Sequence, residues 1–220
     1  MQFYSPALQL ACLDTKYRSL EIEQEPMFVQ ATWDFAYDNG SKITHAFLRE
    51  LAKLQPLSSF KFENLVIDSR THMLKPGWYP CIPGWHHDDV PRPQPLARPE
   101  YDNPWYHSKH IMMVIDSYES PTGSLTEFIQ SRADVPWPLD ERASLYGVWD
   151  AHLSKQEPEI YTVDSGVLVY FDMNSFHRGV PAKKDGWRFF IRASWDTGLY
   201  PQNKIRKNAN VYVPWATAGW

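Results

Sequence analysis

The chain has 220 residues, of which 43% are hydrophobic and 15% aromatic, so it can bury a sizeable core as one domain over residues 1–220. Its 22 Lys and Arg residues stand against 26 Asp and Glu residues, and a net charge of -4 argues against a surface built mainly for nucleic acid. Only Cys12 and Cys81 are present, which excludes a disulfide framework and suits a reducing compartment.

No run of the sequence approaches the roughly 18 apolar residues of a membrane helix. The N-terminal segment lacks the basic stretch of a secretory signal, so we expect a cytoplasmic protein that does not use a membrane. The cluster of Lys204, Arg206 and Lys207 near the C-terminus is too small to be a nucleic-acid signature by itself.

The secondary-structure signals predict one clear helix and several short strands. Thr44–Leu54 has apolar residues at helical spacing and is followed by Pro56, so it predicts a helix packed on the outside of a sheet. Short segments rich in β-branched, aromatic or Met residues between turn signals predict strands. These segments are Asn64–Leu74, His110–Tyr118, Gly166–Phe171 and Trp187–Trp195.

The proline-rich stretch Val90–Trp105 cannot form a central strand, because proline donates no hydrogen bond to a strand ladder. It predicts a long loop, and long loops in compact domains are often functional lids. Tyr101, Trp105 and Tyr106 could close such a lid over a site; surface aromatics that only anchor the loop are an equal alternative.

A candidate metal site follows the Pro-Gly turn signal in "PGWHHDD". Residues i and i+2 of an extended segment point to the same side, so either His86 with Asp88 or His87 with Asp89 converges on one point. His177, which follows an apolar strand and a short polar loop, stands where a third ligand is needed. Two histidines and one carboxylate are the ligand set of iron(II) oxygenases.

The last predicted strand separates into an apolar face and a charged face. Phe189, Ile191 and Ala193 alternate with Arg188, Phe190, Arg192 and Ser194. Guanidinium groups are costly to bury without a partner, so this face predicts a bound anion.

These residues together resemble the iron(II)- and 2-oxoglutarate-dependent dioxygenases, whose pattern is His-x-Asp, a distal His and an Arg shortly after it. The last strand is similar to the taurine-dioxygenase-like branch, with two arginines four residues apart. The resemblance implies a mainly β fold, a double-stranded β-helix of jelly-roll or cupin-like type with a flanking helix, whose core covers about Asn64–Trp195.

The resemblance also assigns roles, in which His86, Asp88 and His177 bind iron(II) and Arg188 pairs with 2-oxoglutarate. Arg192, with Ser194, would support the co-substrate or hold an anionic substrate. The Arg-x-Ser of some relatives falls here at Arg192 to Ser194, which leaves the assignment between the two arginines open. The implied reaction is oxidation, by default hydroxylation, of a small molecule with release of succinate and carbon dioxide.

Two other functions compete with this interpretation. A cupin-like metalloenzyme that does not use 2-oxoglutarate would need another ligand, with His110 in reserve. A jelly-roll module without catalytic activity would bind a ligand or partner and no tight metal. The substrate's identity and the oligomeric state are not determined by the sequence.

Overall fold

The structure is a computed structural model that describes residues 1–54, 61–94, 97–138 and 144–213. It is mainly β, and all its strand pairs are antiparallel. The largest sheet has the order β2 (Leu8–Cys12), β9 (Val167–Asp172), β5 (Lys109–Asp116), β11 (Gly186–Trp195) and β4 (Val66–Leu74). The strands predicted from the sequence are therefore confirmed.

Three smaller sheets complete the β-structure. One has the order β10 (His177–Gly179), β6 (Thr126–Ile129) and β8 (Ile160–Val163). The others pair β1 (Gln2–Phe3) with β7 (Ala133–Asp134), and β12 (Lys204–Arg206) with β3 (Met27–Val29). The large and the three-stranded sheets are separate and not closed, so the double-stranded β-helix stays a prediction.

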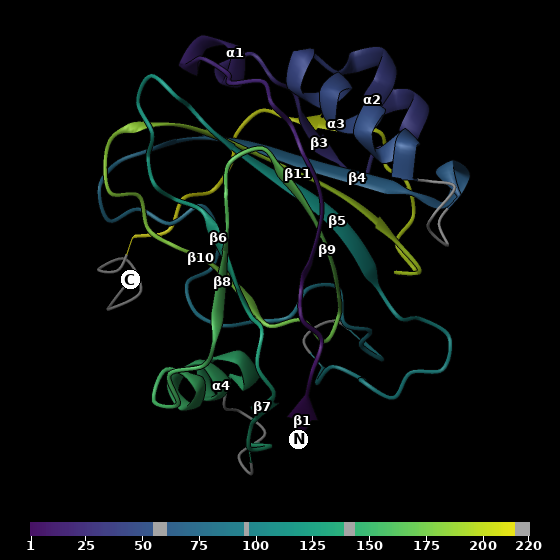
Figure 1. Cartoon of the computed structure of the whole chain (residues 1–220). Coiled ribbons are helices and arrows are strands. Elements are labelled where there is room, and N and C mark those ends of the chain that lie inside the picture. The colour runs from purple at the N-terminus through teal and green to yellow at the C-terminus, as the bar shows by residue number, and fades with distance from the viewer. Residues whose placement is uncertain (55–60, 95–96, 139–143, 214–220) are drawn as a thin grey trace.

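The helices divide between the two ends of the molecule, as Figure 1 shows. Helices α1 (Ser19–Glu23), α2 (Trp33–Asn39) and α3 (Lys42–Leu54) lie together over one face of the large sheet, whereas α4 (Leu145–Leu153) lies near β1 and β7. A one-turn helix, η2 (Phe62–Asn64), leads into β4. Among the described residues, no helix has both the length and the apolar composition to cross a membrane.

Helix α3 forms where the sequence predicts it, although Pro56 lies outside the described residues. Its buried Phe47, Leu48 and Leu51 pack with residues of the large sheet, which confirms that it covers this sheet. The buried carboxylate of Glu25 accepts hydrogen bonds from the N–H groups of Ile43 and Thr44, at 2.5 and 3.2 Å. Glu25 thus caps two first-turn N–H groups that have no partner within the helix.

The alternation of strand β11 places core on both faces of the large sheet. Phe189, Ile191 and Ala193 pack under the helices, as the sequence predicts. On the opposite face, Met112 and Phe171 belong to a second core that also includes residues of β6 and β8. The arginines of β11 point to this second side, so they face the space between the large and the three-stranded sheets.

Candidate metal centre

A backbone bridge brings two histidines together from distant parts of the chain. His177 is the first residue of β10, and the N–H groups of His86 and His177 each donate to the other's carbonyl, at 3.0 and 3.1 Å. The two imidazole ring centroids are 4.5 Å apart. The bridge therefore holds the two rings side by side between the sheets.

Local backbone carbonyls determine which nitrogen of each ring is free. His86 Nδ1 lies 2.9 Å from the carbonyl oxygen of Gly84, and His177 Nδ1 lies 3.0 Å from that of Ser175. A carbonyl oxygen can only accept, so each Nδ1 carries a proton, and Nε2 is the ring nitrogen left to face Asp88 or a metal ion. This is the arrangement in which metal-binding histidines are usually held.

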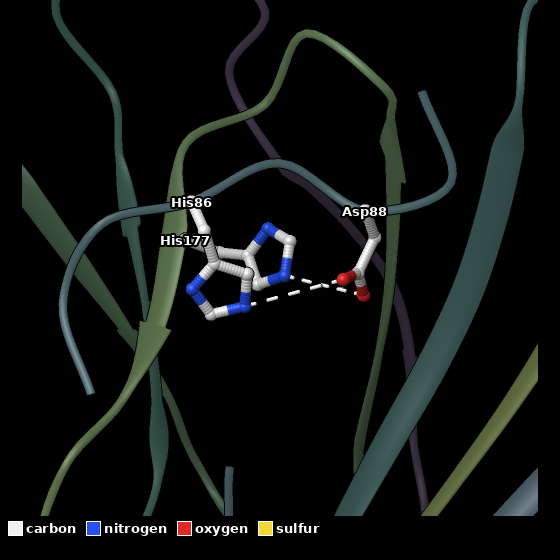
Figure 2. Close-up of side chains that lie close together, drawn as sticks. All are labelled: His86, Asp88 and His177. Atoms are coloured by element: carbon white, nitrogen blue, oxygen red, sulfur yellow. Dashed lines mark ion pairs between the residues drawn. The ribbon is translucent and has the colours of Figure 1, made fainter. Parts of the chain in front are cut away.

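Asp88 completes the group, as Figure 2 shows. Its Oδ2 is 3.3 Å from His177 Nε2, and its Oδ1 is 4.0 Å from His86 Nε2. One ligand atom from each of the three residues lies within 4.8 Å of the other two. Two imidazole nitrogens and a carboxylate oxygen suit a divalent transition metal such as iron(II), so this donor set fits the group that the sequence predicts.

The surroundings favour the protonation states that a metal ion needs. Burial, with His177 beside it, lowers the pKa of His86 and keeps the imidazole neutral. Burial would raise the pKa of Asp88, but Arg192 and then His177 hold it well below its usual range. The site thus offers a neutral imidazole and an ionised carboxylate.

The second possible register of "HHDD" points away from the triad. The rings of His87 and Phe176 lie 3.9 Å apart by centroid, and His87 Nδ1 is 2.7 Å from the hydroxyl oxygen of Tyr101. Asp89 Oδ2 lies 2.8 Å from Arg192 Nη2. The structure therefore places His87 in an aromatic cluster and Asp89 in an ion pair, and it brings His86 and Asp88 to His177.

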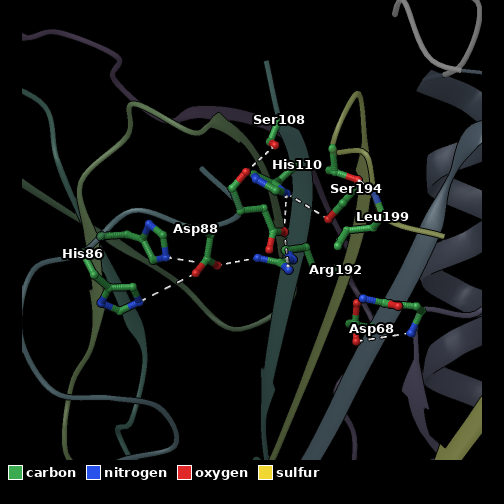
Figure 3. A network of polar contacts seen from close by, with 12 residues as sticks. Asp68, His86, Asp88, Ser108, His110, Arg192, Ser194 and Leu199 are labelled. Carbon is green, nitrogen blue, oxygen red and sulfur yellow. Dashed lines mark hydrogen bonds and ion pairs between the residues drawn. The ribbon is translucent and has the colours of Figure 1, made fainter. Parts of the chain in front are cut away.

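The two arginines of β11 have different partners. Arg192 donates to the carboxylates of both Asp88 and Asp89, and Figure 3 shows the contacts running from His86 through Asp88 to Arg192. Ser194 Oγ lies 2.8 Å from His110 Nδ1 in the same buried network. Arg192 and Ser194 are thus held by neighbouring side chains of the protein.

Arg188 faces a cavity of about 80 Å³ that the three candidate ligands also line. The residue is only 3% exposed, and its Nε donates to the carbonyl of Ser124 at 2.7 Å. Nη2 donates to Thr126 Oγ1 at 3.4 Å, and no carboxylate of the described residues forms an ion pair with Arg188. Burial lowers the pKa of Arg188 to about 10, so its charge is destabilised in the protein alone.

Other residues singled out from the sequence lie around this centre. His72 lines the cavity, and burial with Arg188 beside it lowers the pKa of His72 to about 3. His110 is fully buried and does not belong to the triad. Tyr101 packs in the aromatic cluster, whereas Trp105 is 83% exposed, so the lid stays a prediction.

Sequence reasoning missed the part that the C-terminal segment plays. The carbonyl of Asn210 lies 3.2 Å from His72 Nε2, and Tyr79 and Tyr212 form a backbone bridge. Arg70, which also lines the cavity, could have been found, because it precedes His72 by two residues and shares its face of β4.

No family model and no curated protein matches the chain. Among solved structures, EvdO2 from Micromonospora carbonacea var. aurantiaca, complexed with 2-oxoglutarate, is 14% identical, with a TM-score of 0.41 over 74% of this chain and 69% of that chain. AviO1 from Streptomyces viridochromogenes Tue57 is 13% identical, with a TM-score of 0.39 over 90% and 75%. A Pseudomonas putida prolyl-4-hydroxylase is 16% identical, with a TM-score of 0.33 over 69% and 62%.

In its His-x-Asp and distal His, this chain resembles the iron(II)- and 2-oxoglutarate-dependent oxygenases.

Proposed function

We propose that the protein is an iron(II)- and 2-oxoglutarate-dependent dioxygenase that oxidises a small molecule and releases succinate and carbon dioxide. The observation that carries the proposal is the triad of His86, Asp88 and His177, whose ligand atoms lie within 4.8 Å of one another beside the cavity that Arg188 lines. The two-sheet architecture supports a double-stranded β-helix as the fold behind it.

In this proposal His86 and His177 bind iron(II) through Nε2 and Asp88 binds it through a carboxylate oxygen. When bound, iron and 2-oxoglutarate supply the oxidative chemistry, in which the keto acid is decarboxylated and the substrate is hydroxylated or otherwise oxidised. Arg192 keeps the Asp88 carboxylate in place, because its guanidinium donates to that carboxylate and to Asp89.

Arg188 is the residue we assign to the far carboxylate of 2-oxoglutarate. It has N–H groups beyond those used by Ser124 and Thr126, and it pairs with no carboxylate of the described residues. The apolar side chains of Met112, Phe171 and Phe190 also line the cavity, and they would exclude water from the reacting groups. Arg192 has both of its nearby carboxylates as partners, so it is the poorer choice.

The cupin-like alternative is disfavoured by the position of His110. Its Nδ1 is used by Ser194, and His110 is not among the residues whose ligand atoms lie within 4.8 Å of one another. His110 therefore does not supply a fourth protein ligand. In a metalloenzyme that does not use 2-oxoglutarate, Arg188 would also have no role.

The test is anaerobic titration of the metal-free protein with iron(II) and then with 2-oxoglutarate, followed by the weak visible charge-transfer band of the chelate. We expect the band in the wild type, its loss in His177→Ala, and a much higher requirement for 2-oxoglutarate in Arg188→Met. His107→Ala, at an exposed histidine outside the triad, is the control for histidine loss.

His87→Phe tests the register, because phenylalanine keeps the aromatic packing and removes the second candidate ligand; the band should persist. Iron binding without a band at millimolar 2-oxoglutarate would support the cupin-like alternative. Absence of metal binding would support a binding module without catalytic activity.

A further inference from the structure

A second, larger cavity of about 410 Å³ adjoins the candidate metal centre. His86 and Asp88 line both cavities, so a molecule held in the outer one lies next to the proposed iron ligands. Arg70 also borders both. The outer wall combines two aromatic rings, an aliphatic side chain, a guanidinium and two carboxamides, from Ile82, Tyr146, Arg206, Asn208, Asn210 and Tyr212.

The two arginines of this cavity have unused hydrogen-bonding capacity. Arg70 is half-buried, and its guanidinium has no hydrogen bond or ion pair to any residue in the described part of the chain. Arg206 Nη2 lies 3.3 Å from Asp68 Oδ1 and 3.3 Å from the carbonyl oxygen of Phe28. The Nε of Arg206 is buried and has no partner among the described residues. A buried donor such as the Nε of Arg206 is costly unless a partner satisfies it.

Charge at this cavity is also unbalanced. Arg192 pairs with Asp88, and Arg206 pairs with Asp68, whereas Arg70 has no ion-pair partner among the described residues. Arg70 and Arg206 line the same cavity, and burial, followed by the nearby positive charge of Arg70, lowers the pKa of Arg206. A bound anion would offset this repulsion.

We propose that the outer cavity binds an anionic group of the substrate, a carboxylate, phosphate or sulfate, between Arg70 and Arg206. This inference rests on the proposed function, because it places the rest of the substrate beside His86 and Asp88. Tyr146 and Tyr212 would contact an apolar or ring-shaped part of the same molecule. The substrate class is therefore small organic acids or organic phosphate or sulfate esters.

The test uses isothermal titration of the full chain loaded with manganese(II) and 2-oxoglutarate, with benzoate, phenyl phosphate and phenyl sulfate as separate probes. Benzamide is the neutral counterpart. We expect at least one anion to bind the wild type and benzamide to bind more weakly. Arg70→Met and Arg206→Met should each weaken the anion about tenfold, the loss of one charge-assisted hydrogen bond. The probe that binds best identifies the anion.

Lys207→Met is the matched control, because Lys207 is exposed on the same segment as Arg206 and does not line the cavity. The affinity of Lys207→Met for the anion should equal that of the wild type. If Arg206→Met does not fold, Arg206→Lys and Arg70→Met carry the test, since lysine keeps the charge and should lose less affinity than Arg70→Met.

Three results would overturn the proposal. They are no binding of any of the three anions, equal affinity in the wild type and Arg70→Met, or a weakening in Arg70→Met that affects 2-oxoglutarate alone. The titration is repeated on the metal-free protein. Anion binding that depends on Arg70 there, without any binding of metal or 2-oxoglutarate, would leave the anion site standing and the oxygenase proposal refuted.

Discussion

Arg188 and Arg192 lie on the same face of strand β11, four residues apart, and both are buried. Their surroundings predict different effects on stability when each is replaced by methionine, which has a similar length and no charge. Arg192→Met leaves the carboxylates of Asp88 and Asp89 side by side without their cation. Breaking a buried ion pair in this way costs about 3–5 kcal/mol. Both carboxylates are partly exposed, so we expect a loss in unfolding free energy of about 3 kcal/mol.

Arg188→Met should behave differently, because Arg188 forms no ion pair with a carboxylate of the described residues. Its pKa falls from the ordinary 12.5 to about 10. At about 1.4 kcal/mol per pKa unit, the folded state disfavours the charge by about 3 kcal/mol. Losing the hydrogen bonds to Ser124 and Thr126 costs about 1 kcal/mol each. We therefore expect the unfolding free energy of Arg188→Met to stay within about 1 kcal/mol of the wild type.

The measurement is urea unfolding of both variants and the wild type at pH 7, without metal or 2-oxoglutarate. The partners of each arginine would not explain its effect on stability if Arg188→Met lost more than about 2 kcal/mol of unfolding free energy, or if Arg192→Met lost less than about 1 kcal/mol. Adding manganese(II) and 2-oxoglutarate should stabilise the wild type by about 2.7 kcal/mol at a hundred times the dissociation constant. Arg188→Met should be stabilised much less, because it lacks the guanidinium that we propose binds the far carboxylate of 2-oxoglutarate.

Glu25→Ala should lower the unfolding free energy by about 2 kcal/mol, because the first turn of α3 loses its cap, and urea unfolding measures this. Burial raises the pKa of Glu25 above 4.5. The part of the unfolding free energy that is linked to protonation of Glu25 is therefore fully present below that value and is lost as the pH rises through the raised pKa. The stability of the wild type relative to Glu25→Gln should therefore fall as the pH rises; a difference that stays constant or grows would contradict this. Gly179→Ala places a Cβ atom 2.6 Å from Cys81 Sγ and should cost about 1–3 kcal/mol in thermal unfolding, much of it recovered in the double variant with Cys81→Ala. Trp105→Ala should change the unfolding free energy by less than about 0.5 kcal/mol, and a larger loss would show that this exposed ring is packed in solution.

The sequence predicts those features that depend on local pattern. The helix over Thr44–Leu54, which begins at Lys42 in the structure, strands β4, β5, β9 and β11, and the two faces of β11 all follow from apolar spacing. Such periodicities report directly which side of an element is buried. The His-x-Asp pair and a distal histidine are also visible as residue types at a spacing.

Only the tertiary structure decided which of those residues meet. The choice of His86 and Asp88 over their neighbours comes from the backbone bridge between His86 and His177, which lie 91 positions apart in the sequence, a contact that no local pattern encodes. The different partners of Arg188 and Arg192 depend on Ser124, Thr126, Asp88 and Asp89, which reach β11 from other elements. Apolar periodicity determines which side chains are buried, because burial depends on one element's own faces. Charge pairing requires charged atoms from different elements to lie within a few ångströms of one another, and they meet only in the folded chain.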